Sequence, residues 1–572
     1  MTPRGRRGGF AENASLLAWA LVAGTLGAVP ALLFRWAANA LPKLAWPAAE
    51  DLVQSGAQSP VPWRLLVPPA GLFLAGLVLV AGERWARLGR GWDILEAVRL
   101  KDGVLPFRAT LVRAASSLVT VASAGPVGRE GAIVILPAAV TSALGRRARL
   151  PTRRLRVAVA CGASAGLACA YNTPIGAALF TMEIIFGSFA LEVFAPLVVA
   201  SAAATLLARH FFGATPLFQV PALELHHASD IGGVAVLGIL AGLLAAAFLG
   251  ALRAASAFWK KLSWPRPLAM AAAGLAVGVA ILRYPEIVGN GREAVLHLFA
   301  SPIGVGTALA LLAARLVATP LTVGAGTVGG VFTPTLFVGA MLGTAFGWGQ
   351  SALFPASGVD PRTWALVGMG AVLAGTTHAP LTAAVMVFEM TLDYGLALPL
   401  LVGAGISALV ATRLESDSVY TEALRRGEEG PPAGTALHAR DVMRAEQIPV
   451  PPDLPLPALI DRLLGARRNH AYVVDGAGHY LGVVSLHDAV RAAGEARESS
   501  AFRAADLLDP HFEATFPDEP LARVLERITR QSCERIPVLA DRESRRLVGT
   551  VSRRDILGLY ARELVGGSRE QA

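Results

Sequence analysis

Apolar and polar stretches alternate along most of the chain up to about Glu415. Ile231 to Gly250 and Leu396 to Val410, for example, carry no charged residue. Ala14 to Phe34 is too long for the core of a signal peptide and predicts a first transmembrane helix. Other apolar segments, of about 14 to 22 residues, are broken by Gly and Pro clusters, and the shorter ones cannot cross the ~30 Å hydrocarbon core upright. These interruptions predict helices that end inside the membrane, where freed backbone groups must line a buried or wet cavity.

The pattern changes after Ser416, where charged residues become dense and short strands alternate with amphipathic helices. They form two similar βαββα units, each too small to cover its own sheet, so we expect the two units to pack together. The predicted strands are Ala471 to Val474, Leu481 to Val484, Ile536 to Leu539 and Leu547 to Val551. The predicted fold class is an all-α polytopic membrane protein, an inverted repeat of broken helices, with a C-terminal α/β pair. The predicted ranges are an N-terminal cytoplasmic segment (1–12), a transmembrane domain (13–426) with halves at about 13–215 and 230–415, a linker (427–436) and two α/β units (437–495 and 503–565).

The apolar part of the chain contains an internal repeat. Each copy reads as a Gly/Ala-rich helix, a turn that ends in Pro, and an apolar helix closed by Glu. The matching residues are Gly162, Pro174, Ala177, Ala178 and Glu183 in the first copy and Gly368, Pro380, Ala383, Ala384 and Glu389 in the second. Two related halves, each with a broken helix, are typical of a transporter whose binding site lies at the repeat interface. Chance similarity between Ala-rich helices is the alternative, and it explains poorly why Pro and an intramembrane Glu match together.

Composition and charge support a membrane protein. The chain is 54% hydrophobic and 16% charged, whereas an ordinary soluble protein is about 25% charged. The net charge of +9 does not indicate a nucleic-acid partner, because the basic residues cluster at membrane boundaries. These clusters are Arg4, Arg6 and Arg7 before the first helix, and Arg146, Arg147, Arg149, Arg153, Arg154 and Arg156 in one loop. By the positive-inside rule we expect a multi-pass protein of the inner (plasma) membrane with both termini in the cytoplasm.

A Gly-rich turn from Gly125 to Ala132 opens an apolar helix and carries the candidate gate. An anion inside a bilayer needs partial positive charge, which the free N–H groups of a helix N-terminus supply. Gly128, Arg129 and Gly131 are therefore candidate anion ligands. Glu130 stands where an anion would bind, so it is a candidate gate and proton carrier. The alternative is that Glu130 caps its helix and pairs with Arg129.

The second half offers a similar turn at Gly329 to Pro334. Its candidate anion ligands are Gly330, Val331 and Phe332, and we expect the N–H groups of Val331 and Phe332 to face the ion. An ordinary Gly/Pro kink in a membrane helix is the alternative.

These residues resemble the CLC family of chloride channels and proton-coupled chloride exchangers. The sequence GREG at Gly128 to Gly131 is similar to one family motif, and GGVFTP at Gly329 to Pro334 is similar to another. The resemblance implies a homodimer with one pore in each subunit and a chloride ion bound by helix N-termini from both halves. It also implies a tyrosine hydroxyl contact, for which Tyr420 stands at the matching place. The alternative role for Tyr420 is an interfacial aromatic anchor.

Two departures from the family pattern bear on mechanism. The family's first pore motif corresponds to Gly89, Arg90 and Gly91, where the serine and proline that bear on anion choice are absent, so selectivity cannot be carried over. The family's internal proton-relay glutamate corresponds to Ile184, which cannot carry a proton. This favours a passive channel and leaves a proton-coupled antiporter as the alternative. Glu183 and Glu389 are expected to bond to backbone within the helix bundle rather than to act in transport.

The C-terminal units resemble CBS domains, and this resemblance implies ATP, ADP or AMP as a ligand. A carboxylate suits ribose hydroxyls, so the candidate nucleotide-binding residues are Ser485, Asp488, Ser552 and Asp555. The alternative is that each Ser caps a helix and each Asp stands in its first turn.

Two other classes of membrane protein are alternatives to an anion transporter. A CBS-regulated divalent-cation transporter would need several oxygen ligands in one place, whereas Glu130, Glu183 and Glu389 lie on separate segments. An intramembrane hydrolase would need metal-ligand spacing that the histidines lack. The three lone cysteines predict neither a disulfide nor a metal site. We therefore expect a transporter of chloride or another small anion, not an enzyme, with no required cofactor.

Overall fold

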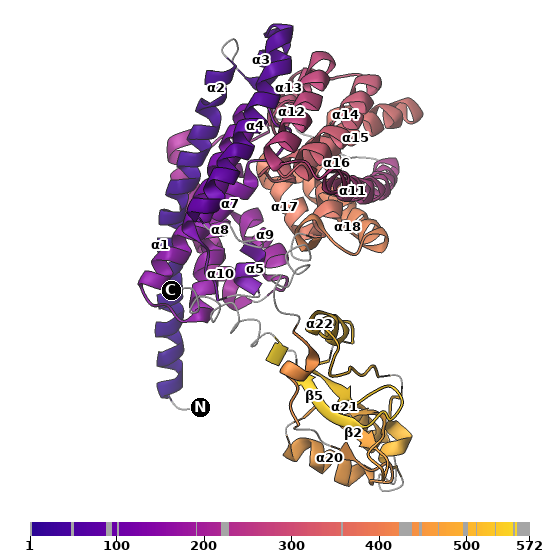
Figure 1. The fold of residues 1–572 in the computed structure, drawn as a ribbon. Coiled ribbons are helices and arrows are strands. Elements are labelled where there is room, and N and C mark those ends of the chain that lie inside the picture. Colours follow the sequence, from indigo (N-terminus) through magenta and orange to yellow (C-terminus); the bar gives the residue numbers. More distant parts are fainter. Residues whose placement is uncertain are drawn as a thin grey trace. The chain divides into compact units, whose positions relative to one another are not determined.

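The chain forms two compact units, Met1–Glu428 and Glu429–Ala572, which we call the membrane unit and the C-terminal unit and describe separately (Figure 1). The computed structural model describes residues 3–46, 51–86, 94–99, 102–189, 191–218, 228–355, 359–422, 437–445, 449–466, 468–495, 502–510, 512–531, 533–552 and 555–556.

The membrane unit is helical throughout its described residues. In the first half the helices are α1 (Pro3–Ala40), α2 (Pro42–Ala45), α3 (Leu52–Gln58), α4 (Val61–Ala86), α5 (Ile94–Arg99), α6 (Phe107–Ala122), α7 (Glu130–Arg147), α8 (Thr152–Tyr171), α9 (Pro174–Phe180) with a π-helical continuation (Thr181–Phe186), and α10 (Leu191–Phe212). In the second half they are α11 (Ala228–Leu262), α12 (Arg266–Arg283), α13 (Arg292–Ala300), α14 (Val305–Gly324), α15 (Phe332–Leu353), α16 (Pro361–Thr377), α17 (Pro380–Thr391) and α18 (Ala397–Leu414).

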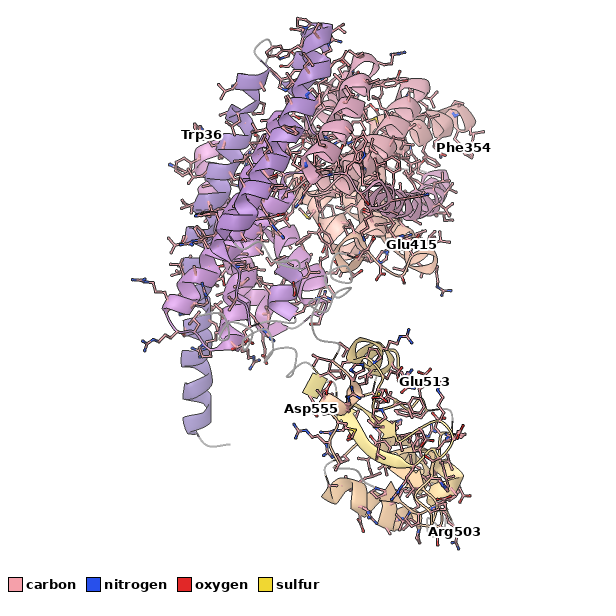
Figure 2. The ribbon with its side chains drawn as sticks, in the orientation of Figure 1. Trp36, Phe354, Glu415, Arg503, Glu513 and Asp555 are labelled. Atoms are coloured by element: carbon pink, nitrogen blue, oxygen red, sulfur yellow. The ribbon has the colours of Figure 1, made fainter. Side chains whose placement is uncertain are left out.

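Long and short helices are mixed, as the apolar pattern predicts. Among the described residues, seven helices are long and apolar enough to cross a bilayer, whereas α9 and α17 are shorter apolar helices. Trp36 projects from α1 with 65% of its surface exposed (Figure 2), as suits a side chain that faces lipid or its interface. The first helix starts earlier than predicted. It begins at Pro3, so most of the predicted cytoplasmic segment (1–12) is part of α1. Helical hydrogen bonds are internal to the segment, so a helix can run on beyond the apolar stretch.

The repeat found in the sequence is present in the fold as two matching pairs, α8 with α9 and α16 with α17. In each pair the first helix ends at a left-handed residue, Asn172 (φ 59°) or His378 (φ 56°). A proline, Pro174 or Pro380, then starts the short helix. The left-handed residue reverses the chain, and proline fits the first helical turn because no N–H is needed there.

The glutamates that close the two copies each cap the short helix of the other copy. Glu389 accepts hydrogen bonds from the N–H groups of Ile175 and Gly176 at 3.1 and 2.7 Å. Glu183 accepts from the N–H and the hydroxyl of Thr382 at 2.8 and 2.6 Å. The expected bonding of these carboxylates to backbone is confirmed, and it ties the two halves together.

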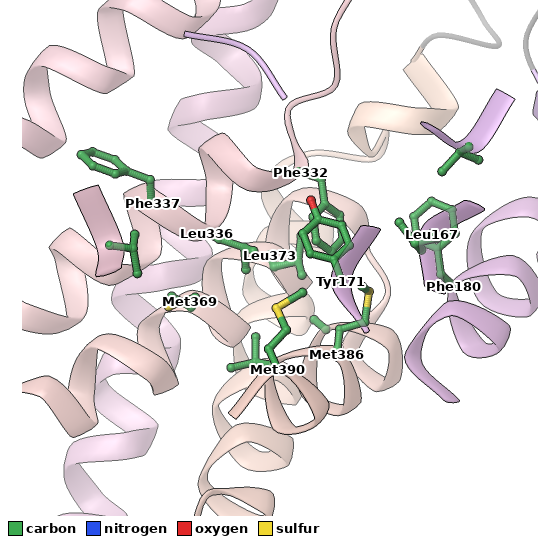
Figure 3. Packing of buried hydrophobic residues seen from close by; sticks show 14 of the residues in the cluster. Leu167, Tyr171, Phe180, Phe332, Leu336, Phe337, Met369, Leu373, Met386 and Met390 are labelled. Carbon is green, nitrogen blue, oxygen red and sulfur yellow. The ribbon is translucent and has the colours of Figure 1, made fainter. Parts of the chain in front are cut away.

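The largest core cluster of the membrane unit draws apolar side chains from both halves. Leu167, Tyr171 and Phe180 of the first half pack in the same cluster as Phe337 and Met390 of the second (Figure 3). Helices α15 and α16 approach closely at two glycines, where a Cβ on either would lie 2.4 or 2.3 Å from the carbonyl oxygen of the other. These glycines are Gly339 and Gly368.

The C-terminal unit contains two similar α/β modules. The first consists of β1 (Pro449–Val450), α20 (Leu456–Gly465), β2 (His470–Val474), β3 (Tyr480–Ser485) and α21 (Leu486–Glu495). The second contains α22 (Leu521–Arg530), β4 (Arg535–Leu539) and β5 (Leu547–Ser552). The four predicted strands are confirmed to within one residue at each end. Strand β1 pairs in parallel with β2, and β3 and β5 are antiparallel to β2 and β4.

The second module differs from the predicted βαββα order. Among its described residues the first strand is reduced to a single parallel bridge between Thr515 and Val538. The corresponding strand of the first module, β1, has only two paired residues. The two modules therefore differ little at this position. The two modules pack as expected, because Tyr472 and Tyr480 of the first share a cluster with Leu539 and Leu547 of the second.

Candidate functional site

The helices α7 and α15, one from each half, begin beside each other. The N–H of Gly128 donates to the carbonyl oxygen of Gly330 at 2.6 Å, and the N–H of Gly330 donates to the carbonyl oxygen of Gly128 at 2.7 Å. Each of these glycines stands two residues before its helix. The sequence therefore predicted correctly that the two Gly-rich breaks meet.

This pairing changes the ligand set that the sequence suggested. The N–H groups of Gly128 and Gly330 each donate to the carbonyl oxygen of the other glycine, so in this structure they are not available to an anion. The first amides inside each helix have no carbonyl partner four residues earlier. Gly131 and Phe332 lie in these first turns, and Val331 directly precedes α15.

Glu130 is the first residue of α7, and its side chain is buried between the two helix starts with only 5% of the residue exposed. Its Oε1 accepts a hydrogen bond from the hydroxyl of Tyr171 at 2.6 Å and another from the hydroxyl of Thr333. The two hydroxyl oxygens are themselves 2.6 Å apart. One carboxylate oxygen is thus held by donors from both halves. We call the space around this carboxylate the Glu130 site.

The other carboxylate oxygen, Oε2, is buried and has no hydrogen-bond partner among the described residues. It fits because the neighbouring residues are glycines. A Cβ on Gly128 would lie 1.7 Å from Oε2, and one on Gly330 would lie 2.7 Å from it. The two glycines therefore give the carboxylate its room in addition to pairing the helices.

Arg129 does not pair with Glu130. Its guanidinium donates to Oδ1 of Asn39 on α1 at 2.9 Å. The alternative in which Glu130 is held by Arg129 is therefore not what the structure contains.

A row of four aromatic rings leads from the Glu130 site to Tyr420. The ring centroids of Tyr171 and Phe332 are 5.2 Å apart, those of Phe332 and Phe180 are 6.4 Å apart, and those of Phe180 and Tyr420 are 5.5 Å apart (Figure 3 labels the first three). Tyr420 packs partly buried against the same core cluster. Phe332 and Tyr420 lie far apart in the sequence, but both pack against the ring of Phe180.

Ile184, at the internal relay position, lies in the π-helical segment and is 5% exposed. A cation lies directly beside its backbone. Arg99 of α5 donates from Nη2 to the carbonyl oxygen of Ile184 at 2.5 Å and from Nε to that of Ile185 at 2.8 Å.

The remaining candidate residues divide into two groups. Gly89, Arg90 and Gly91 lie outside the described residues. In the C-terminal unit, Ser485 donates its hydroxyl to Asp488 and accepts the Asp488 N–H at 3.0 Å, and Ser552 and Asp555 repeat this arrangement. Ser485 therefore caps α21, which is the alternative role considered for it, and Ser552 makes the equivalent bonds to Asp555. Asp555 also forms an ion pair with Arg444 at 2.6 Å.

The sequence reasoning missed three contributors to the site: Tyr171, Thr333 and Arg99. Tyr171 closes a Gly/Ala-rich helix and Thr333 directly follows Phe332 in the second Gly-rich turn, and these positions were the available signal. Arg99 gave no such signal, because its partners are carbonyl oxygens 85 and 86 residues away in the sequence. Among the described residues, no group of three or more His, Cys, Asp or Glu side chains could hold a metal ion.

Comparison with known proteins shows the family of the chain. The family described as voltage gated chloride channel matches residues 71–412, and the CBS domain matches residues 439–495 and 504–562. A putative chloride channel protein ClcB-like of Ralstonia nicotianae is 39% identical over 430 residues, which are 73% of this chain and 100% of that protein. The voltage-gated ClC-type chloride channel ClcB of Escherichia coli is 33% identical over 365 residues, which are 63% of this chain and 87% of that protein.

Solved structures give the same class of fold. A slow cyanobacterial Cl⁻/H⁺ antiporter has a TM-score of 0.64 and 26% sequence identity, and the match covers 72% of this chain and 97% of that one. A eukaryotic CLC transporter has a TM-score of 0.61 and 19% identity, and the match covers 94% of this chain and 97% of that one. The chain therefore belongs to the CLC family of voltage gated chloride channels, and its C-terminal unit carries two CBS domains.

Proposed function

We propose that the protein moves chloride or a similar small anion across the bilayer through the Glu130 site, with Glu130 as the gate. The observation that carries this proposal is the buried carboxylate of Glu130, enclosed by the starts of two helices that bond to each other through Gly128 and Gly330. The relatives named as chloride channels support chloride as the first anion to test.

The chemistry of gating follows from competition between two negative groups. The first amides of α7 and α15, including those of Gly131, Val331 and Phe332, and the two helix dipoles create a region of partial positive charge. Glu130 occupies it when the path is closed. When the carboxylate is protonated or swings away, the same amides are free to bind the anion, and Tyr420 provides a further hydroxyl contact farther along the row of aromatic rings.

We further propose that transport is passive. The buried side chain of Ile184 has no group that can take up a proton, and the Arg99 guanidinium lies against the Ile184 carbonyl. A fixed cation near the path repels a proton and attracts an anion. Both features favour anion conduction without proton coupling.

A proton-coupled antiporter is the second candidate function. One observation favours it, namely the 26% identity with a solved Cl⁻/H⁺ antiporter. In that case Glu130 would also carry the proton, and a residue other than Ile184 would pass the proton to the inner side.

Reconstituted liposomes test the proposal. We expect chloride efflux that collapses an imposed membrane potential, and no uphill proton movement when only a chloride gradient is applied. Proton movement driven by chloride would establish the antiporter instead. Divalent-cation flux without anion flux would favour the cation-transporter class and contradict the proposal.

A substitution at the gate tests the role of Glu130. Glu130→Gln keeps the size of the side chain and removes its charge, so we expect flux that no longer depends on pH. Unchanged flux together with unchanged pH dependence would show that Glu130 is not the gate.

The resemblance to the CLC family also implies an assembly and a form of regulation. We propose a homodimer in the inner membrane, with cytoplasmic termini and an adenine nucleotide at the CBS pair. Size measurement in detergent and calorimetric titration with ATP, ADP and AMP test the dimer and the nucleotide independently of transport.

A further inference from the structure

A small cavity lies next to the Glu130 site at the end of the membrane unit where α1 ends and α13 begins. We call it the outer cavity. Its volume is about 110 Å³, and the lining residues that matter here are Arg35, Tyr171, Asn172, Phe212, Thr215 and Arg292. Tyr171 connects it to the gate, because the Tyr171 hydroxyl donates to Glu130. The outer cavity is therefore one side chain away from the carboxylate.

The charges that line the outer cavity are all positive. Arg35 comes from α1 and Arg292 from the first residue of α13. The guanidinium of Arg35 donates to the carbonyl oxygen of Cys169 at 2.8 Å and lies 4.2 Å from the centroid of the Phe212 ring. Neither contact neutralises its charge. Among the residues that the structure describes, no carboxylate lines this cavity.

The positive charge is concentrated further by a third guanidinium. Arg129 and Arg292 both lie close enough to Arg35 for the like charges to repel each other. Like charges that lie close together in a partly buried place repel each other, and an anion between them lowers this repulsion. Glu293 lies near Arg292 and offsets part of the repulsion, and an anion beside Arg35 would offset more of it.

The neutral polar groups at the outer cavity also favour an anion. Arg209 donates to Oδ1 of Asn172 at 2.7 Å, so the group of Asn172 that stays available is the amide nitrogen, a donor. The volume of 110 Å³ exceeds the ~30 Å³ that one water occupies in the liquid. The cavity thus has room for a small anion with part of its water shell.

We propose that Arg35 and Arg292 bind a small inorganic anion in the outer cavity, as a site separate from the Glu130 site. This inference rests on the proposed function, since it supplies the anion that enters when Glu130 leaves. Arg292 also lines a larger cavity of about 430 Å³ beside Arg129 and Lys43. Asp51 and Glu293 also line that larger cavity, so its charges are mixed. The anion therefore binds in the outer cavity, where both charged lining residues are arginines.

If an anion binds in the outer cavity, substitutions there should change the chloride dependence of transport at the outer face only. Charges at an entrance raise the local ion concentration without changing the site beyond it. In Arg35→Gln and Arg292→Gln we expect the half-saturating chloride concentration at the outer face to rise about 3- to 10-fold. The maximal flux and the half-saturating concentration at the inner face stay unchanged.

The test uses the full-length protein in supported membranes, oriented by a C-terminal tag, with chloride varied on one face at a time. Arg292→Lys keeps the charge, so we expect a smaller shift than in Arg292→Gln. Arg283→Gln is the matched control, because Arg283 is an exposed arginine at the end of α12 that packs on the Tyr284 ring 5.1 Å away and does not line the outer cavity. It should change nothing.

Bromide diffraction provides a readout that does not depend on transport. Crystals of the full-length protein soaked in bromide should show an anomalous peak between Arg35 and Arg292 that is lost in the double Gln variant. Absence of the peak, or an equal shift of chloride dependence at both faces, would overturn the outer site. A wild-type protein that passes no anion would instead overturn the proposed function, so the two failures are distinguishable.

Discussion

The starts of α7 and α15 are built from the same backbone plan but carry different first residues. In both, a glycine two residues before the helix pairs with its counterpart, and the first turn leaves amides unpaired. Helix α7 then begins with Glu130, whereas α15 begins with Phe332. The repeat thus provides the backbone of the proposed anion site twice, whereas the carboxylate proposed as the gate occurs only in the first half.

The paired glutamates Glu183 and Glu389 give the opposite lesson. They match across the repeat and have equivalent bonds to the partner helix. The acid that occurs in both halves, Glu183 or Glu389, therefore has a structural role. The proposed gate, Glu130, occurs in the first half only. Of the four predictions below, which run from the largest expected effect to the smallest, the first three test this distinction.

Closing the space around the carboxylate should have the largest effect. In Gly330→Ala, the new Cβ would lie 2.7 Å from Oε2 of Glu130, so we expect the closed position to be lost and the pH dependence of chloride flux with it. Gly349→Ala, on the same helix α15 with open space around it, is the control. Retained pH dependence in Gly330→Ala would mean that Glu130 does not need this position to close the path.

Removal of one hydroxyl should have the next largest effect. Tyr171→Phe deletes a donor to a buried carboxylate, and hydrogen bonds to charged groups contribute about 1.5–3 kcal/mol. We expect the ratio of open to closed protein to rise about 10- to 100-fold, measured as flux at neutral pH relative to acidic pH. Tyr394→Phe is the control, since Tyr394 is 84% exposed. An equal change in both variants would contradict a specific role for Tyr171.

The two symmetric glutamates should affect stability rather than gating. Glu183→Ala and Glu389→Ala each leave first-turn amides unpaired, which costs about 1–3 kcal/mol. We expect similar losses of thermal stability in detergent and an unchanged pH dependence of the remaining flux. A variant that keeps its stability but alters that pH dependence would break the proposed link between symmetry and structural role.

The smallest effect should come from a difference between the two CBS modules. His470 begins β2 where Arg535 begins β4, and burial lowers the pKa of His470, although Asp488 and Glu534 act in the opposite direction. The unfolded chain then binds a proton more readily than the folded one. The stability of the module is complete above the ordinary histidine pKa of about 6.5 and decreases as the pH falls below it.

Thermal unfolding of the full-length protein across this pH range measures the effect. We expect His470→Gln to reduce the acid-dependent loss by less than about 1 kcal/mol. His487→Gln is the control. If His470→Gln unfolds with the same pH dependence as the wild type, the buried histidine does not account for the loss.

The internal repeat of the membrane unit and the strands of the CBS modules could be predicted from the sequence. The two halves could be aligned because Pro and Glu recur together. The strands of the CBS modules could be located from short apolar runs, two of which are followed by Ser. The first strand of the second module could not be predicted correctly, because a single bridge such as Thr515 to Val538 leaves no periodic pattern.

The candidate site was predicted only in part for a different reason. Glycines and Glu130 were recognisable from local sequence, but the donors to the carboxylate come from 41 and 203 residues away. The pairing of Gly128 with Gly330 is equally distant, and it removes two amides that local reasoning had offered to the anion. Contacts between halves decide which backbone groups are available, and no local pattern reports them.

The exchange of glutamate caps between the halves has a consequence for how the protein is made. While only the first half has left the ribosome, α9 has no acceptor for its leading amides, because that acceptor is Glu389. The same holds in reverse for α17 and Glu183. If the gene is split between α10 and α11, the two fragments should fold completely only when they are produced together. Each fragment supplies the glutamate that caps the short helix of the other.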